Sequence, residues 1–364
     1  MKGGDSTAKQ KYYRITNIKK TKAQYRILLG ERSNGKSYAV KEHCLLKAYE
    51  KGNEFALLRR YKQDVRESDI EAYFADMPIY SITNGEYDII SVYRGSIYFA
   101  KIAEDGKIAR GKKCGHIFYL SGNERFKSQA FPYITDIIFE EFVTNKMYLP
   151  NEPSELQHFV STIARRRLIT VWMIGNTISR VCPYYVEWGL KNIPYQQQGT
   201  IDVYEIVTNQ VDDGGKQVVV KIAVENCANS GNNSKMFFGK TGEQITGGQW
   251  ETKEQPHLPR DYAEYEMLYE LLFNEMNFNF VIQLLINADG GVVTYVYPFT
   301  KKRNIKRVVT SVFSDNPFVT RYLRDDINAE RLIKECLTQG KVCFSDNLTG
   351  CDFIQILENR KGGL

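Results

Sequence analysis

Continuous apolar runs separated by a helical pattern dominate the first half of the chain. The runs are short, and they lie at residues 26–29, 55–58, 134–139 and 168–174. The stretch KSYAVKEHCLLKAYEK, residues 36–51, has a helical pattern instead. Apolar strands without polar alternation are typical of a parallel sheet that helices cover on both faces. The pattern therefore predicts an α/β fold.

The segment from Tyr87 to Phe118 alternates apolar and polar residues and contains Gly and Asp-Gly turns. This alternation predicts an antiparallel hairpin that is inserted in the parallel sheet or lies at its edge.

The composition changes between about Thr208 and Gln255, where Gly, Asn, Asp, Gln and Thr dominate. Such a stretch is typical of a linker or a small irregular module. We therefore predict a first domain over residues 1–207, a linker or small module over 208–255, and a smaller second domain over 256–364.

Two different patterns open the second domain. Residues 260–276 predict an amphipathic helix. Its apolar stripe consists of Tyr262, Tyr265, Leu268 and Leu272. The segment FNFVIQLLINADGGVVTYVYPF, residues 278–299, predicts two strands joined by a turn at 287–291. With the mixed pattern that follows, this domain is expected to be α+β.

Charge and cysteine content narrow the class of protein. The 364 residues carry a formal net charge of +6, a modest excess that suggests a nucleic-acid partner without specifying it. The seven cysteines are scattered and form no CxxC pair, which argues against a disulfide framework or a zinc site and fits a reducing cytoplasm. No apolar signal region opens the chain, and no apolar run approaches the roughly 20 residues that span a bilayer. We therefore expect neither secretion nor a membrane partner.

The strongest chemical motif is GERSNGKS, which follows the first apolar run and opens the helical stretch. It matches GxxxxGK[ST], a loop whose backbone N–H groups and following helix bind phosphate. The predicted nucleotide-binding residues are Gly30, Glu31, Arg32, Ser33, Asn34, Gly35, Lys36 and Ser37. In such a loop Lys36 reaches the β- and γ-phosphates of ATP, and Ser37 ligates Mg²⁺. The alternative is a glycine turn with a solvated lysine.

Two acidic residues, Glu140 and Glu141, follow the apolar run 134–139. A nucleoside triphosphatase needs an acidic residue for the metal and a base that orients water. We assign Glu140 to Mg²⁺, with contact through water because glutamate is longer than the usual aspartate, and Glu141 to the attacking water. Paired glutamates after a strand also occur at the start of an ordinary helix.

Three arginines, Arg165, Arg166 and Arg167, lie between a helical stretch and the apolar run 168–174. An arginine from a neighbouring subunit can stabilise the charge on a transferred phosphoryl group. The alternative is a solvated basic helix end. Asn176, just after the run, is placed to sense the γ-phosphate, unless it belongs to an ordinary turn.

In order and spacing, these residues resemble the DNA-encapsidation ATPases of small tailed podophages of the phi-twenty-nine type, relatives of the large terminases. The resemblance covers about residues 25 to 190. It rests on GERSNGKSYAVK, FALLRRYKQDV, KSQAFPYITDIIFEEF and YLPNEPSEL. It implies a P-loop NTPase domain of the ASCE type, like those of RecA and the terminases.

The resemblance also implies roles for single residues. The family's trans-acting arginine falls on Arg165, with Arg166 and Arg167 as alternatives, and a second functional lysine falls on Lys127. The family's catalytic glutamate matches Glu141. Its Walker B aspartate is replaced by Glu140.

The resemblance further implies a homo-oligomeric ring, commonly of five subunits, that drives double-stranded DNA into an empty capsid. Such a ring docks on the portal vertex through a packaging RNA, in the host cytoplasm. The C-terminal domain is implied to be RNase H-like and nuclease-derived. A two-metal nuclease gathers several carboxylates, usually with one on the first strand. Because the strand FNFVIQLLIN has no acidic residue, we expect no nuclease activity.

The second domain contains a run of five cations that is a candidate nucleic-acid contact. The run consists of Lys301, Lys302, Arg303, Lys306 and Arg307. Such a run neutralises phosphates and gives salt-dependent binding to the DNA backbone without base readout, unless it is merely a solvated loop. A second set, in the predicted hairpin, comprises Arg110, Lys112 and Lys113.

The sequence thus predicts an ATP-driven DNA-packaging motor. One rival is a helicase or another DNA-dependent P-loop ATPase, which would act without a capsid. Another is a non-catalytic nucleic-acid-binding or assembly module with a degenerate loop. A small-molecule kinase is a third rival, but it leaves the second domain unexplained.

Overall fold

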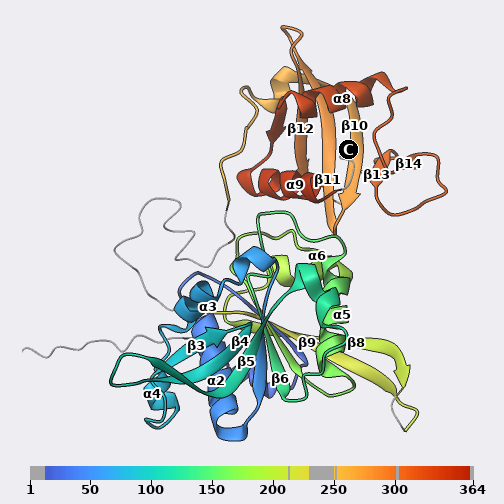
Figure 1. Ribbon diagram of the computed structural model, residues 1–364. Coiled ribbons are helices and arrows are strands. Elements are labelled where there is room, and N and C mark those ends of the chain that lie inside the picture. The colour runs from blue at the N-terminus through green and yellow to red at the C-terminus, as the bar shows by residue number, and fades with distance from the viewer. Residues whose placement is uncertain (1–12, 212–213, 229–249, 251, 301–302, 361–364) are drawn as a thin grey trace, which may run out of the picture. The chain divides into compact units, whose positions relative to one another are not determined.

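The computed structural model describes residues 13–211, 214–228, 250, 252–300 and 303–360 (Figure 1). Two compact units share the chain, and each is built from three segments. The first unit comprises Met1–Thr144, Leu149–Thr177 and Asn192–Gln249, and the second comprises Asn145–Tyr148, Ile178–Lys191 and Trp250–Leu364. None of the helices in the described part of the chain is both long enough and apolar enough to cross a membrane.

A nine-stranded sheet forms the centre of the first unit, in the order β3-β4-β5-β2-β6-β7-β1-β9-β8. The strands are β1 (Tyr25–Leu29), β2 (Glu54–Arg59), β3 (Ile89–Tyr93), β4 (Ser96–Ile102), β5 (Ile108–Tyr119), β6 (Ile134–Glu140), β7 (Thr170–Ile174), β8 (Thr200–Val211) and β9 (Gln217–Asn226). The six strands from β5 to β9 in this order are parallel, and antiparallel strands lie at both edges. Strand β7 therefore separates β1 from β6.

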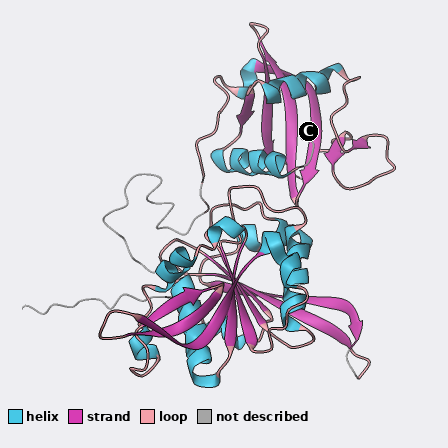
Figure 2. Ribbon diagram, in the orientation of Figure 1, coloured by secondary structure: helices cyan, strands magenta, loops and turns pink. Residues whose placement is uncertain are grey.

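Helices cover both faces of this sheet, as Figure 2 shows for the helices and strands in separate colours. Helix α2 (Lys36–Lys51) packs with Phe55 and Trp172 in the core of one face. Helix α5 (Glu152–Ala164) lies on the other face, where Phe159 contacts Phe118 of β5. The other helices in the described part of this unit are α1 (Thr16–Lys20), η1 (Lys62–Asp64), α3 (Glu67–Phe74), α4 (Ile79–Ile82), η2 (Leu120–Phe126) and η3 (Ile193–Tyr195).

The predicted α/β fold with a parallel core is confirmed. The helix expected over residues 36–51 is α2, and the antiparallel segment expected between Tyr87 and Phe118 is formed by β3, β4 and β5. Strand β5 then pairs in parallel with β2, which joins the hairpin to the core of the sheet.

The predicted linker over residues 208–255 is wrong in its first part. Strand β9 lies within that range and pairs in parallel with β1, the strand that precedes the loop at residues 30–35. Its sequence, QVVVKIAVEN, is a continuous apolar run of the kind that a buried parallel strand needs. Segments rich in Gly and Asn on both sides lower the mean apolar content of the region and so mask the strand in the composition. The first unit consequently extends to Gln249 rather than to residue 207.

The second unit contains a six-stranded sheet in the order β14-β13-β10-β11-β12-β15. The strands are β10 (Tyr265–Glu275), β11 (Phe278–Asn287), β12 (Val292–Pro298), β13 (Val308–Thr310), β14 (Val319–Thr320) and β15 (Val342–Phe344). The first three strands are antiparallel neighbours, while β13 and β14 add in parallel beside β10. In chain order the sheet therefore reads 3-2-1-4-5, as in RNase H-like folds, with β15 added at the β12 edge.

Two amphipathic helices pack on one face of this sheet. They are α8 (Asn328–Thr338) and α9 (Asn347–Asn359), and Figure 1 shows both against the strands β10 to β12. Ile333 of α8 and Phe353 of α9 share a core with Phe273 and Ile282. The other helices of the unit are α6 (Pro183–Glu187) and η4 (Tyr262–Glu264).

The helix predicted over residues 260–276 is wrong, because most of this segment is strand β10. Tyr269, Leu271 and Phe273 alternate with outward residues and pack on the helix-covered core. This period of two competes with the helical stripe, and strand partners on both sides favour it. The two strands and the turn predicted for residues 278–299 are present as β11 and β12.

Candidate functional site

The loop between β1 and α2 has the backbone that its glycines predict. Gly30 has a φ of 147°, and a Cβ atom there would lie 3.2 Å from the carbonyl oxygen of Cys227. Gly35 has a φ of 93° and caps the N-terminus of α2. Because both positions favour glycine, the loop can turn tightly into the helix and present its N–H groups to an anion.

Lys36 is only 4% exposed, and its ammonium group lies across the loop. It donates hydrogen bonds to the carbonyl oxygen of Glu31, to Asn34 Oδ1 at 3.2 Å and to Asn176 Oδ1 at 3.4 Å. Burial lowers the pKa of Lys36, although nearby acidic groups oppose that change. Its three partners are neutral oxygens, so this buried cation suits an anionic ligand such as phosphate.

Ser37 and Glu140 meet at the start of α2. The Ser37 hydroxyl donates to Glu140 Oε2 at 3.3 Å, and Glu140 is 6% exposed at the end of β6. Burial raises the pKa of Glu140, while hydrogen bonds from Tyr73 and Ser37 and the charge of Arg59 oppose the rise. A hydroxyl and a carboxylate oxygen side by side are the ligand types that Mg²⁺ prefers.

Glu141 differs from the adjacent Glu140 in its exposure, its backbone conformation and its partners. Its side chain is 76% exposed, and its backbone has a φ of 57°. Arg59 at the end of β2 holds its carboxylate at 3.3 Å. The Arg60 guanidinium accounts for the unusual backbone, because it donates to the carbonyl oxygens of Glu141 and Phe142.

Four residues of this site were not assigned from the sequence: Arg59, Arg60, Tyr73 and Glu152. Arg60 forms a buried bidentate pair with Glu152, and Tyr73 donates to Glu140. The pair Arg59–Arg60 had a usable signal, because it follows an apolar strand whose carboxyl end lies at the phosphate edge of a parallel sheet. No sequence signal pointed to Tyr73, because its helix α3 is separated along the chain from GERSNGKS and from Glu140.

Arg165 lies at the opposite ends of the parallel strands from the phosphate loop, and Lys127 lies in the connection between η2 and β6. Arg165 directly follows α5 and precedes β7, whereas Asn176 follows β7, so the full length of that strand separates Arg165 from the phosphate loop of its own chain. The Arg165 guanidinium donates to the carbonyl oxygen of Gln129 at 2.7 Å, two residues from Lys127. Both side chains are exposed, and Lys127 pairs with Glu124.

The two neighbouring arginines differ in their surroundings. Arg167 is half-buried and donates to four backbone carbonyls, two of them in Phe131 and Ile163, which fixes the chain before β6. Arg166 is exposed and, like Arg165, has a positive φ. The guanidinium of Arg167 is thus committed to its own chain.

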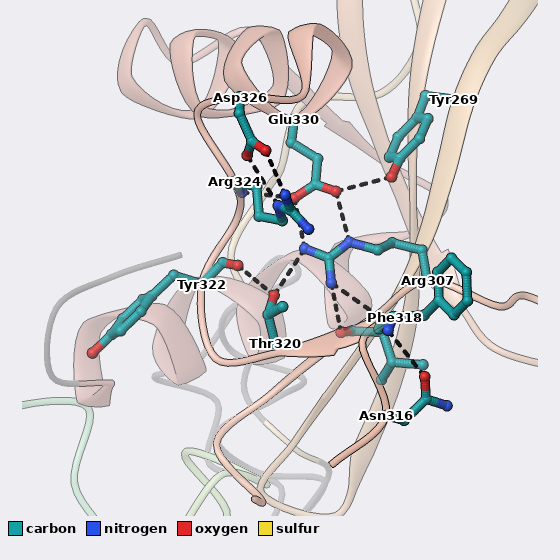
Figure 3. A network of polar contacts seen from close by, with 10 residues as sticks. Tyr269, Arg307, Asn316, Phe318, Thr320, Tyr322, Arg324, Asp326 and Glu330 are labelled. Atoms are coloured by element: carbon teal, nitrogen blue, oxygen red, sulfur yellow. Dashed lines mark hydrogen bonds and ion pairs between the residues drawn. The ribbon is translucent and has the colours of Figure 1, made fainter. Parts of the chain in front are cut away.

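The basic run of the second unit is only partly exposed, because Arg307 belongs to the network of polar contacts that Figure 3 shows. Arg307 is 8% exposed and forms a two-pronged pair with the fully buried Glu330, so its assignment as a nucleic-acid contact is wrong. Arg303 is exposed and donates to Glu270 and to Tyr297, and Lys306 is exposed. The other two members, Lys301 and Lys302, lie outside the described residues.

The second set of cations also bonds to its own chain. Arg110 donates to Ser91 and lies over the Tyr93 ring, Lys112 donates to the carbonyl oxygen of Tyr49, and Lys113 pairs with Glu54. Because these three side chains are bonded within the chain, they are less available to bind nucleic acid.

Strand order and site together define the class. A phosphate loop after β1, an acidic residue ending β6, and β7 between them carrying Asn176 at its end are the arrangement of an ASCE-type P-loop NTPase. The family model described as podovirus DNA encapsidation protein (Gp16) matches residues 7–218. The chain belongs to this family of DNA encapsidation proteins.

Similar proteins extend the match. The DNA packaging protein of Bacillus phage phi29 is 31% identical over 84% of this chain and 85% of its own length. The DNA packaging protein of Bacillus phage B103 is 32% identical over 45% of this chain and 47% of its own length, so the chain matches about half of that relative. Among solved structures, the bacteriophage Phi-29 genome packaging motor assembly has a TM-score of 0.52 at 20% identity, over 96% of this chain and 99% of that one. The Phi-28 gp11 DNA packaging motor has a TM-score of 0.50 at 14% identity, over 97% and 98%. These two likenesses support the fold across both units.

Proposed function

We propose that this protein is a subunit of a motor that hydrolyses ATP to drive double-stranded DNA into a viral procapsid. The observation that carries the proposal is that Lys36, Ser37, Glu140 and Asn176 meet at the carboxyl ends of the central parallel strands. The chain that contains them belongs to the DNA encapsidation family. The relatives named above are DNA packaging proteins, and the fold matches packaging-motor structures.

In the proposed reaction, residues 30–37 bind the phosphates of ATP, with Lys36 neutralising their charge. Ser37 and Glu140 would hold Mg²⁺, which supplies charge stabilisation at the phosphates when bound. Glu141 would orient the attacking water, since it is exposed beside the loop and is held by Arg59. Asn176 would contact the γ-phosphate from the end of β7.

Arg165 and Lys127 are proposed to act on the nucleotide of an adjacent subunit. The position of Arg165 before β7, at the opposite strand ends from its own phosphate loop, supports action in trans, and its bond to Gln129 lies two residues from Lys127. Hydrolysis would then depend on a homo-oligomeric ring, which we propose to have five subunits. The ring would dock on the portal vertex of a procapsid in the host cytoplasm, through a packaging RNA.

The second unit is proposed to bind nucleic acid or capsid and to lack nuclease activity. Lys301, Lys302, Arg303 and Lys306 are the proposed contacts to the DNA backbone. The first strand of its sheet is β10, not FNFVIQLLIN, and it does contain glutamates. Glu270 pairs with Arg303, and Glu275 accepts from Ser311, which leaves these carboxylates engaged. Among the described residues, no three His, Cys, Asp or Glu side chains are grouped so as to hold a metal.

The substitution Glu141→Gln tests the proposed reaction. It should leave nucleotide binding intact, because the Glu141 side chain pairs with Arg59 and is assigned to water rather than to phosphate, and lower DNA-stimulated ATP turnover by about 10²- to 10⁴-fold. Steady-state ATPase rates with and without DNA, beside nucleotide titrations, measure both effects. Glu205→Gln on β8, an exposed glutamate paired with Lys221, is the matched control and should change neither.

If neither the wild-type protein nor the Glu141→Gln variant hydrolyses ATP, with or without DNA, the motor is contradicted. A non-catalytic assembly module is then favoured. DNA unwinding by the wild-type protein without capsids would favour a helicase.

A further inference from the structure

Tyr73 contacts the candidate metal carboxylate from outside both sequence motifs. It lies on α3, which follows β2 in the chain. Its hydroxyl donates to Glu140 Oε1 at 2.5 Å, while Ser37 donates to Glu140 Oε2 at 3.3 Å. Each oxygen of this buried carboxylate therefore has one hydroxyl partner, and its orientation is fixed from two sides.

The same ring also contacts the cation that holds Glu141. The Arg59 guanidinium carbon lies 5.5 Å from the centre of the Tyr73 ring, and Arg59 pairs with Glu141 at 3.3 Å. The face of an aromatic ring attracts a guanidinium at this distance. Tyr73 thus touches Glu140 directly and supports the partner of Glu141.

Helix α2 holds Tyr73 in place. Lys41 lies one turn after Ser37, donates to the carbonyl oxygen of Tyr73 at 2.6 Å and pairs with Asp76. Its ammonium nitrogen is 4.4 Å from the centre of the Tyr73 ring. The buried Phe74 packs edge-on against that ring at 5.0 Å. The ring is therefore held by the helix that also carries Ser37.

The identity of residue 140 explains why such support is needed. P-loop NTPases commonly hold their metal with an aspartate at the end of this strand. Glutamate has one more rotatable bond, so an unsupported carboxylate would sample more orientations at an entropic cost. A hydroxyl on the second carboxylate oxygen removes that freedom.

We infer that Tyr73 is a positioning residue that orients Glu140 toward Ser37 and the nucleotide-bound Mg²⁺ and supports Arg59 against Glu141. The inference rests on the proposed function, because it assigns Glu140 to that metal. Tyr73 itself touches neither nucleotide nor water in this role.

The substitution Tyr73→Phe removes the hydroxyl and keeps the ring on Lys41 and Arg59. In full-length protein, the affinity for a fluorescent ADP analogue in EDTA should be unchanged. The Mg²⁺ concentration that half-saturates the protein–ADP complex should rise about tenfold, as expected for one lost hydrogen bond to a charged group. Tyr49→Phe is the matched control, because it removes a hydroxyl that donates to Glu86, away from the site, and it should leave both quantities unchanged.

A double-mutant cycle adds a readout that general damage to the fold would not produce. In a Glu140→Asp background the shorter side chain cannot reach the Tyr73 hydroxyl, so Tyr73→Phe should change the Mg²⁺ requirement less than twofold. Equal, additive effects in both backgrounds would overturn the inference. So would an unchanged Mg²⁺ requirement in Tyr73→Phe alone.

Failure of the proposed function gives a different result. Wild-type protein that binds no ADP, with or without Mg²⁺, would overturn the nucleotide site and the role of Tyr73 with it. Wild-type protein with a Mg²⁺-dependent complex and no response in Tyr73→Phe would overturn only the role of Tyr73.

Discussion

Arg307 and Glu330 form a buried ion pair that ties three parts of the second unit together. Glu330 of α8 accepts from Arg307, from Tyr269 of β10 and from the backbone N–H of Arg324 (Figure 3). Arg307 also donates to the carbonyl oxygen of Phe318 just before β14. The sequence offered no way to separate this arginine from its basic neighbours, because burial depends on the sheet and on α8.

Glu330→Gln should destabilise the second unit by about 3 to 5 kcal/mol, because it leaves the Arg307 charge buried without its partner. Thermal and urea unfolding of full-length protein measure the change. Asp326→Asn is the control at an exposed pair with Arg324, and it should change the unfolding curves far less than Glu330→Gln does, because water screens an exposed ion pair. Equal losses in the two variants would contradict the buried ion pair.

The Arg307–Glu330 pair makes the stability of the second unit depend on pH, and the stability should fall in acid. Burial alone would raise the pKa of Glu330, but hydrogen bonds from Arg307, the Arg324 N–H and Tyr269 outweigh it and lower the pKa. The stabilisation is therefore complete above the ordinary glutamate pKa of about 4.3 and is lost as pH falls through the lowered folded-state value. The stability difference between wild type and Glu330→Gln should accordingly shrink in acid, which unfolding curves from pH 7 down to pH 3 would show.

At the scale of elements, the sequence was sufficient wherever one local signal dominated. The β1–loop–α2 unit, the strands β6 and β7 and the β11–β12 hairpin each combine an apolar run with a clear turn or cap, and each was predicted. Strands β9 and β10 were missed because their assignment depends on partners distant in the chain: β1 for β9, and β11 with β13 for β10. The same limit applied to Tyr73, whose partner Glu140 is 67 residues away.

The presence of strand β9 should decide whether a fragment of the first unit stays soluble. A fragment of residues 1–207 leaves β1 at an open sheet edge, whereas residues 1–228 retain β9. Burial of Ile222 and Val224 of β9 is itself worth about 3 to 6 kcal/mol. The shorter fragment should therefore aggregate while the longer one stays soluble, as judged by size-exclusion chromatography. Both lack the same part of the second unit, so equal behaviour would contradict the role of β9.

At the scale of the whole molecule, the position of Arg165 predicts complementation between chains. Arg165→Ala should lower ATP turnover about 10³-fold or more, and Lys36→Ala should abolish nucleotide binding. A mixture of the two variants should regain part of the activity, because an intact loop on one chain can meet an intact arginine on another. The ATPase rate of the mixture measures this gain.

The control for complementation is a chain that carries both substitutions, mixed with Lys36→Ala. No chain in that mixture has an intact loop, so the mixture should stay silent. If the first mixture is also silent although both variants assemble as the wild type does, Arg165 does not act in trans.

Because the two units are interleaved along the chain, neither a single proteolytic cut nor recombination at one point of the gene can separate them cleanly. The chain enters the second unit at Asn145 and Ile178, shortly after Glu141 and Asn176, and returns both times before it enters finally at Trp250. A single cut near residue 250 would therefore leave two pieces of the second unit on the wrong fragment. For the same reason, recombination at one point of the gene cannot exchange this unit intact. The second unit can be exchanged between related phages only together with the loops that follow β6 and β7.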